Sequence, residues 1–203
     1  MLTIVDTGIA NVGSIKYKLY NHGIESNIAK SASDLSEASK IILPGVGHFK
    51  EAMKRLNENH FAETLRDKVL IQKTPILAIC LGMQLLTNKS EEGDCMGLGL
   101  VDAETVKFQF DNNKLKIPHV GWNGISLKQE SKILKNINHK HLFYFTHSYY
   151  VKCNDKSIIL STTNYGVDFV SSIKKGNIYA TQFHPEKSHE TGFQIITNFI
   201  NNI

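Results

Sequence analysis

The stretch that most constrains how this chain folds is residues 74–86, where a short apolar run gives way to a helical pattern. The apolar residues 76–79 follow Pro75, which cannot donate to a sheet ladder, and this predicts a short buried strand that starts just after the proline. Leucines then recur at helical spacing after Cys80. The sequence therefore predicts a strand followed directly by a helix, with Cys80 at the turn between them.

Cys80 occupies a position that suits a nucleophile. A side chain on a tight strand-to-helix turn is held out of the sheet, and the helix N-terminus offers free backbone N–H groups beside it. The positive end of the helix also favours the thiolate over the thiol. Gly82 is expected to leave room for a substrate near the sulfur. The alternative is that Cys80 is a small buried apolar residue, as most free cysteines are.

A second apolar run, residues 178–183, leads to His184, and Glu186 follows two residues later across Pro185. A cysteine, a histidine and a carboxylate that each lie at a strand end can act as nucleophile, base and orienting group. We therefore predict that Cys80, His184 and Glu186 meet in one catalytic site. The alternative is that the histidine and the glutamate form a local surface pair.

The first half of the chain alternates strand patterns with helical ones, which is typical of a parallel sheet with right-handed crossovers. The expected strands are residues 2–5, 24–29, 41–43 and 76–79, and the expected helical segments are residues 50–57 and 61–71, a helix capped by Ser14 and a short turn capped by Ser33. With 203 residues the chain is long enough for one sizeable core and short for two, so a single domain over residues 1–203 is expected.

Strand patterns dominate after Gly97, which predicts antiparallel hairpins beside the parallel sheet. The strand-like segments are residues 104–110, 114–117, 143–151, 158–163, 167–173 and 178–183, with turns at 111–113 and 175–177 and a packing helix over 192–203. Residues 118–123, which contain the only tryptophan, Trp122, are expected to form a loop between two strands. Trp122 is either half-buried core or an exposed interface anchor.

Two glycine-containing segments follow predicted strands. Residues 6–14 resemble a phosphate cradle only in part, because they lack the full Gly-x-Gly-x-x-Gly pattern and a Lys-Ser/Thr ending. In Pro44-Gly45-Val46-Gly47, two glycines around one valine leave a peptide free to rotate, so that it can aim an N–H at an oxyanion near Cys80. The alternative for this segment is an ordinary turn.

Composition argues against several classes of function. The formal net charge of +4 is modest and the lysines are scattered, so nucleic-acid binding is not expected. No apolar run approaches the roughly 20 residues of a membrane span, and the first residues turn acidic too soon for a signal peptide. Three cysteines without Cys-x-x-Cys spacing suit a reducing, cytoplasmic setting. His139, His141 and His147 lack a further ligand at a known spacing, so no metal site is expected.

Cys-Leu-Gly-Met-Gln at 80–84, together with His-Pro-Glu at 184–186, resembles the class I (triad) glutamine amidotransferase family, whose members release ammonia from glutamine. Within that family, residues 44–47, 118–123 and 184–188 are similar to segments of the glutaminase subunits of imidazole glycerol phosphate synthases. The resemblance runs from residue 6 to residue 188. It implies a flavodoxin-like three-layer α/β fold, with a parallel central sheet and antiparallel strands added in the second half, and no cofactor.

The resemblance also implies roles for individual residues. The implied catalytic residues are Cys80, His184 and Glu186, the implied oxyanion-hole residues are Val46 and Leu81, the implied glutamine-binding residues are Gly47, Gln84, Ser148 and Tyr149, and the implied partner-facing residues are Asn11, Trp122 and Lys187. Strand packing is the alternative interpretation of Tyr149. The partner in such subunits is a (β/α)8-barrel cyclase of histidine biosynthesis, which forms a heterodimer with the glutaminase and consumes its ammonia.

Three positions depart from the family pattern, since Thr7 stands in place of a tyrosine and Ala10 and Ala78 each stand in place of a glycine. Ala78 is expected to crowd the turn if the backbone is strained there. Thr7 and Ala10 bear on the identity of the partner. Two alternatives stay open, namely a related subunit that supplies ammonia to a surface-sugar biosynthetic enzyme and a non-catalytic, glutaminase-like regulatory protein.

Overall fold

The computed structural model describes residues 1–110 and 115–203, and its framework is an eight-stranded sheet in the order β2-β1-β3-β4-β14-β13-β12-β9. The strands are β1 (Leu2–Val5), β2 (Asn27–Ala29), β3 (Lys40–Gly45), β4 (Ile76–Cys80), β9 (Ser126–Leu127), β12 (Ile159–Tyr165), β13 (Val167–Lys175) and β14 (Ile178–Thr181). Neighbours pair in parallel from β2 to β14 and antiparallel from β14 to β9. The predicted α/β class, with a parallel sheet extended by antiparallel strands, is confirmed.

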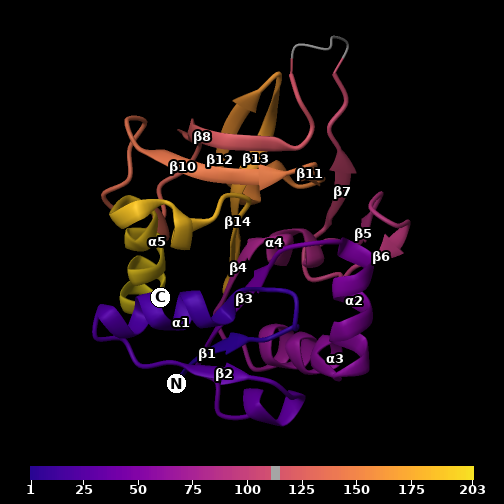
Figure 1. The fold of residues 1–203 in the computed structure, drawn as a ribbon, viewed down its shortest axis with the longest axis vertical. Helices are drawn as coiled ribbons and strands as arrows, with labels where there is room; N and C mark the ends of the chain where they lie inside the picture. The colour runs from indigo at the N-terminus through magenta and orange to yellow at the C-terminus, as the bar shows by residue number, and fades with distance from the viewer. Residues whose placement is uncertain (111–114) are drawn as a thin grey trace.

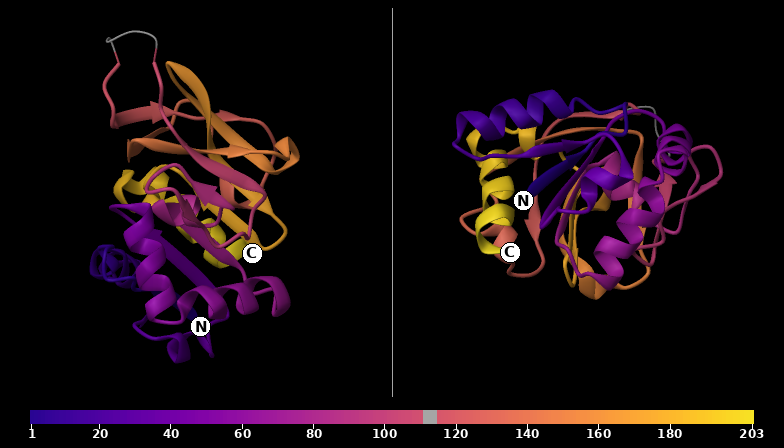
Figure 2. Two further views of the ribbon diagram at one scale, coloured as in Figure 1. Left: turned by 90° about the vertical axis from the view of Figure 1, so that its right-hand side faces the viewer. Right: turned by 90° about the horizontal axis from the view of Figure 1, so that it is seen from below.

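Helices cover both faces of this sheet and make three layers (Figures 1 and 2). The helices are α1 (Val12–Asn21) and α5 (His189–Asn202) on one face, and α2 (Phe49–Glu58) and α3 (Phe61–Arg66) on the other, with a π-helical turn (Asp67–Ile71) continuing α3. Because side chains alternate along a strand, β3 sends Ile42 into the core beneath α1 and α5, and Ile41 and Leu43 into the core beneath α2 and α3. In the described ranges, no helix combines the length and apolar character needed to cross a bilayer.

Two smaller sheets lie above the carboxyl ends of the parallel strands (Figure 1). One pairs β8 (His119–Gly124) with β10 (Leu142–His147), and the other contains β5 (Lys89–Ser90), β6 (Cys95–Met96), β7 (Ala103–Lys107) and β11 (Tyr149–Cys153) in the order β11-β7-β5-β6. Single 3-10 turns occur at Ala32–Leu35, Lys132–Leu134, Lys156–Ile158 and Pro185–Lys187. Ligands bind outside the carboxyl ends of the strands in open α/β sheets, so these sheets are placed to close over a site.

Several predicted elements in the second half are wrong. The strand predicted over 143–151 is two strands, β10 and β11, because the chain leaves one sheet and joins another at Ser148. The loop predicted over 118–123 is largely strand β8, in which Trp122 lies in register with Tyr144. Residues 115–117 are not part of a strand, and the predicted turn at 111–113, together with Lys114, lies outside the described residues.

Three smaller corrections concern caps and ends in the described chain. The side chain of Asn11 accepts a hydrogen bond from the Ser14 N–H at 3.0 Å, so Asn11 caps α1 in place of Ser14. The turn predicted to start at Ser33 begins after Ser31. The last parallel strand ends at Thr181, so His184 lies three residues beyond the strand.

Candidate active site

Cys80 is the last residue of β4 and directly precedes the short helix α4 (Leu81–Leu85). Its backbone has φ 55° and ψ −110°, a conformation that is rare for a residue with a side chain. Such strained strand-to-helix turns hold a nucleophile out of the sheet. The sulfur lies 3.9 Å from the carbonyl oxygen of Thr146 and 3.7 Å from Nε2 of Gln182.

Two glycines allow the turn to pack tightly against β3. A Cβ on Gly82 would lie 2.0 Å from the carbonyl oxygen of Leu43, and a Cβ on Gly45 would lie 2.8 Å from the backbone nitrogen of Gly82. The expectation that Gly82 makes room for a substrate is therefore wrong, because the space that it leaves is filled by β3. Ala78 lies inside β4, in register with Leu43, and the positive φ falls on Cys80 instead, so Ala78 does not crowd the turn.

His184 and Glu186 form the second part of the site. His184 Nδ1 lies 2.8 Å from Glu186 Oε1, and the histidine side chain is 1% exposed. The backbone of His184 is fixed from both sides, since its N–H donates to the Tyr144 carbonyl at 2.9 Å and its carbonyl accepts from the Ser188 hydroxyl at 2.6 Å. Ser188 also accepts from the Tyr144 N–H at 2.9 Å. This serine, which the sequence analysis did not single out, ties the histidine to β10.

The second ring nitrogen of His184, Nε2, is buried and has no hydrogen-bond partner within residues 1–110 and 115–203. Burial lowers the pKa of His184, but the neighbouring Cys80 sulfur and the Glu186 carboxylate raise it by more than burial lowers it. The resulting pKa is about 10. The raised pKa favours an imidazolium, which Glu186 orients through Nδ1 and which lies near the Cys80 sulfur. A thiolate beside an imidazolium is an activated nucleophile.

A cavity of about 220 Å³ opens at Cys80 and brings together residues from distant parts of the chain. The residues that line it are Val46, Gly47, Cys80, Leu81, Gln84, Glu92, Pro118, Thr146, His147, Ser148 and Tyr149. This set contains every residue predicted for the oxyanion hole and for glutamine binding. The small sheets contribute Thr146 and His147 from β10 and Tyr149 from β11 to this lining.

Strand pairing determines which way the backbone points at Ser148 and Tyr149, two residues that line this cavity. The Phe108 N–H donates to the Ser148 carbonyl at 3.1 Å, and bonded and non-bonded pairs alternate in an antiparallel ladder. Tyr149, the next residue, therefore directs its N–H and C=O away from β7. Its carbonyl accepts from Gln84 Nε2 and from His147 Nδ1, each at 2.8 Å. Gln84 thus holds the strand that lines the cavity.

Glu92 is a cavity residue that the sequence analysis missed. It lies between β5 and β6, and its Oε2 accepts from the Phe49 N–H at 2.7 Å. No periodic pattern or motif marks a single glutamate in such a loop. Its carboxylate gives the cavity an anionic side chain, which suits a ligand with a positively charged amino group.

A second cavity, of about 120 Å³, lies beside the triad residues and contains two of the predicted partner-facing residues, Asn11 and Lys187. Val46 lines both cavities. Trp122, the third predicted partner-facing residue, is 42% exposed on β8 and stacks on His189 at 4.8 Å. The structure places these three residues on elements next to the candidate site.

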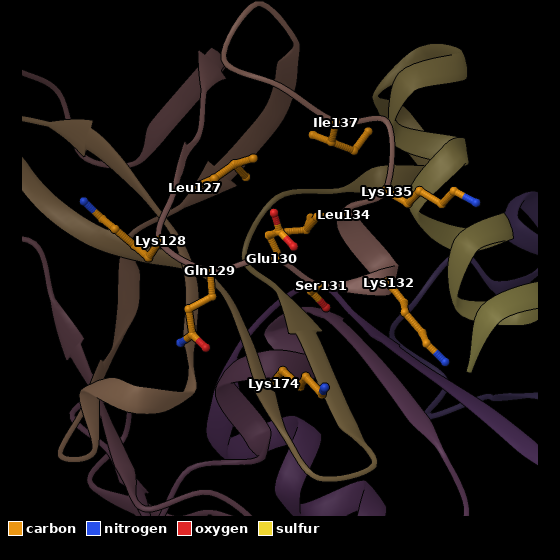
Figure 3. A pocket seen from close by; sticks show the side chains of 10 residues that line it. All are labelled: Leu127, Lys128, Gln129, Glu130, Ser131, Lys132, Leu134, Lys135, Ile137 and Lys174. Carbon is orange, nitrogen blue, oxygen red and sulfur yellow. The ribbon is translucent and has the colours of Figure 1, made fainter.

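A third cavity, of about 830 Å³, is a different feature (Figure 3). It is lined by residues 127–132 with Leu134, Lys135, Ile137 and Lys174. Figure 3 shows the Lys128 and Lys132 side chains extending in opposite directions, so its lysines do not converge on one anion. None of its lining residues is among those predicted for the site.

The flavodoxin-like strand order agrees with what comparison with known proteins finds. The glutamine amidotransferase class-I family model matches residues 3–203. The chain therefore belongs to the class I glutamine amidotransferase family. A solved glutamine amidotransferase superposes with a TM-score of 0.76 at 15% identity over 98% of both chains, which shows the shared fold. A glutamine amidotransferase from Thermotoga maritima gives 0.67 at 14% identity, over 99% of this chain and 82% of that one.

Within this family, two similar curated sequences are subunits of imidazole glycerol phosphate synthase. The chain is 49% identical over 200 residues to the imidazole glycerol phosphate synthase subunit HisH 2 of Methanococcus maripaludis, covering 98% of both. It is 47% identical to subunit HisH 1 of Campylobacter jejuni, again covering 98% of both. Identities at this level over nearly the whole length place the chain among the HisH glutaminase subunits.

Proposed function

We propose that this protein hydrolyses glutamine to glutamate and ammonia with Cys80, His184 and Glu186, and that the ammonia passes to a (β/α)8-barrel cyclase subunit in histidine biosynthesis. The observation that carries the proposal is the strained turn that presents Cys80 beside the buried His184–Glu186 pair, at one end of a cavity with an anionic side chain. Full-length similarity to HisH subunits supports the cyclase as the acceptor of the ammonia.

In the proposed reaction, the Cys80 thiolate attacks the side-chain amide carbon of glutamine. The carbonyl oxygen becomes an oxyanion, which the N–H groups of Val46 and Leu81 stabilise in this proposal. His184 Nε2–H gives its proton to the leaving nitrogen, the C–N bond breaks, and ammonia departs from a γ-glutamyl thioester. His184 then takes a proton from water, which attacks the thioester and releases glutamate. Glu186 keeps the imidazole in the required orientation.

The partner is proposed to dock on the surface that carries Asn11, Trp122 and Lys187. Ammonia that reaches neutral water is mostly protonated and is no longer nucleophilic, so a docked partner protects it. The second cavity connects this surface with the triad, because it is lined by Asn11 and Lys187 together with His184 and Glu186. The three free cysteines are compatible with the proposed cytoplasmic location, where thiols stay reduced.

The experiment that tests the proposed function measures glutamate release from glutamine by the purified chain, alone and with a barrel cyclase and its nucleotide substrate. A low rate that rises strongly in the liganded complex supports the histidine-pathway subunit. Hydrolysis that does not respond to the cyclase points to another acceptor, such as a surface-sugar enzyme. Failure of a glutamine analogue to label Cys80 as well would indicate a non-catalytic relative.

Replacing Glu92 with glutamine is expected to raise the KM for glutamine by about 30-fold and to change kcat little. The substitution removes the anionic partner proposed for the substrate's amino group, and a hydrogen bond to a charged group contributes about 2 kcal/mol. Steady-state glutaminase kinetics of the complex check this, with Glu91→Gln as the matched control because Glu91 is not among the cavity residues. An unchanged KM in Glu92→Gln would exclude Glu92 from substrate binding.

Replacing Trp122 with alanine is expected to weaken association with the cyclase by about 30-fold, since a central aromatic anchor contributes about 2 kcal/mol or more. The exposed ring stacks on His189 and is not part of the buried core, so the unfolding transition of the isolated chain should change little. Titration calorimetry measures the affinity and circular dichroism measures the fold. The exposed Tyr20→Ala is a control away from the proposed docking residues. Equal affinity for wild type and Trp122→Ala would remove the interface assignment.

A further inference from the structure

Two buried histidines lie at the glutamine cavity, which His147 helps to line, and the proposed mechanism does not use them. His119 on β8 and His147 on β10 are directly opposite each other in the antiparallel ladder, and they are 1% and 6% exposed. Aromatic rings pack around them, including Tyr165, which stacks on His119 with ring centroids 4.0 Å apart, and Phe145 at 5.1 Å. Polar side chains this deeply buried require hydrogen-bond partners.

The hydrogen bonds of the two rings form a chain in which His119 donates to His147 and His147 donates to the Tyr149 carbonyl. His147 Nδ1 lies 2.8 Å from the Tyr149 carbonyl oxygen, which can only accept, so this nitrogen carries the proton. Burial lowers the pKa of His147 to about 3, and the neutral ring has a lone pair on Nε2. His119 Nδ1, at 3.1 Å, must therefore donate to it. The chain of donors ends on the same carbonyl that Gln84 holds.

The other end of this chain is Asn123, which lies on the same face of β8 as His119. Its side-chain oxygen, Oδ1, lies 2.8 Å from His119 Nε2. Burial also lowers the pKa of His119, and a neutral His119 that donates through Nδ1 accepts at Nε2. A half-turn of the Asn123 amide exchanges its oxygen and nitrogen, so that its N–H donates to His119 Nε2. Each acceptor among Asn123, His119, His147 and the Tyr149 carbonyl then has a donor.

We infer that His119 is a positioning residue that acts through His147 to fix the Tyr149 carbonyl, and with it the backbone that binds the amino-acid end of glutamine. The inference rests on the proposed function of the cavity. Two donors, His147 and Gln84, hold the carbonyl from different elements, so the peptide cannot rotate without breaking both bonds. His119 determines which tautomer His147 adopts, and only the tautomer with the proton on Nδ1 can donate to the carbonyl.

Two substitutions at His119 separate hydrogen bonding from packing. His119→Phe keeps an aromatic ring in the aromatic cluster but removes the donor to His147. His119→Asn leaves a smaller side chain but keeps an amide N–H near the position of Nδ1. If His119 acts as a donor, we expect about a tenfold rise in the KM for glutamine in His119→Phe, the size expected for one lost hydrogen bond of about 1.4 kcal/mol, and a largely restored KM in His119→Asn. The value of kcat should stay within about threefold in both.

The matched control is Tyr165→Phe, which alters the same cluster and removes the bond from the Tyr165 hydroxyl to the Lys116 carbonyl. It leaves His119 and its partners in place, so the KM should not change. The second readout is the nitrogen NMR signature of the His147 ring, which distinguishes a proton on Nδ1 from one on Nε2. Wild type and His119→Asn should show the Nδ1–H form, and His119→Phe should lose part of it.

An unchanged KM for glutamine in His119→Phe, or a larger rise in KM in His119→Asn than in His119→Phe, would overturn the inference and indicate a packing role. If the wild-type chain hydrolysed no glutamine with any partner, the proposed function would fail instead. The tautomer of His147 in the three proteins would still test the donor chain in that case, because the NMR signature does not depend on activity.

Discussion

Replacing Cys80 with serine is expected to reduce glutamine hydrolysis by about 10⁴-fold or more, the scale on which loss of a triad nucleophile acts. A serine hydroxyl is far less acidic than a thiol, so the neighbouring His184 cannot generate a comparable nucleophile. The serine is close in size and can occupy the same strained turn, so the fold should persist. The measurement is glutamate release by the complex with the cyclase.

The control for Cys80→Ser is synthesis from added ammonium salt, which bypasses the glutaminase. This activity should remain close to that of the wild-type complex, because the acceptor site belongs to the cyclase. Cys153→Ser offers a second control, since burial raises the pKa of that thiol to about 12 and keeps it protonated. Persistent glutamine hydrolysis in Cys80→Ser would show that the nucleophile is a different residue.

Replacing Val46 with proline is expected to lower kcat by about 100-fold to 1000-fold, the effect of removing one oxyanion donor. Proline has no N–H, so the peptide at position 46 can no longer stabilise the oxyanion in any orientation. Val46 is 37% exposed and follows the last residue of β3, so its side chain contributes little to the core. Single-turnover formation of the thioester measures the chemical step directly.

Val46→Ala is the matched variant, because it changes the side chain and keeps the N–H. It should retain most of the wild-type kcat. A similar loss of activity in both variants would mean that the side chain matters and that the N–H does not. Full activity in Val46→Pro would assign the oxyanion contact to other donors.

The parallel part of the fold could be predicted because its strands are buried on both faces. Residues 41–43 and 76–79 therefore appear as continuous apolar runs, and both were found. Strand β8 was missed for the opposite reason. Its inward side chains, His119 and Asn123, are polar, and its outward ones, Val120 and Trp122, are apolar and exposed, so hydropathy gives no sign of a strand with a buried face.

The candidate triad could be identified from sequence because each member follows a recognisable apolar run. The structure brings His184 and Glu186 together and places Cys80 beside them, although their catalytic roles stay predictions. Glu92 and Ser188 could not be found in this way. Each depends on a contact with a residue more than 40 positions away, Glu92 with Phe49 and Ser188 with Tyr144, and no local pattern encodes such a contact.

Val46 lines both the cavity at Cys80 and the cavity beside His184 and Glu186, and this shared residue has a consequence for efficiency. If this peptide rotates as predicted, one event changes both cavities, and production of ammonia is then coupled to access to the proposed docking surface. We then expect the isolated chain to waste glutamine at a rate determined by how often the peptide rotates without a partner. The ratio of glutamine consumed to cyclase product formed would then measure how often the Val46 peptide rotates without a productive partner.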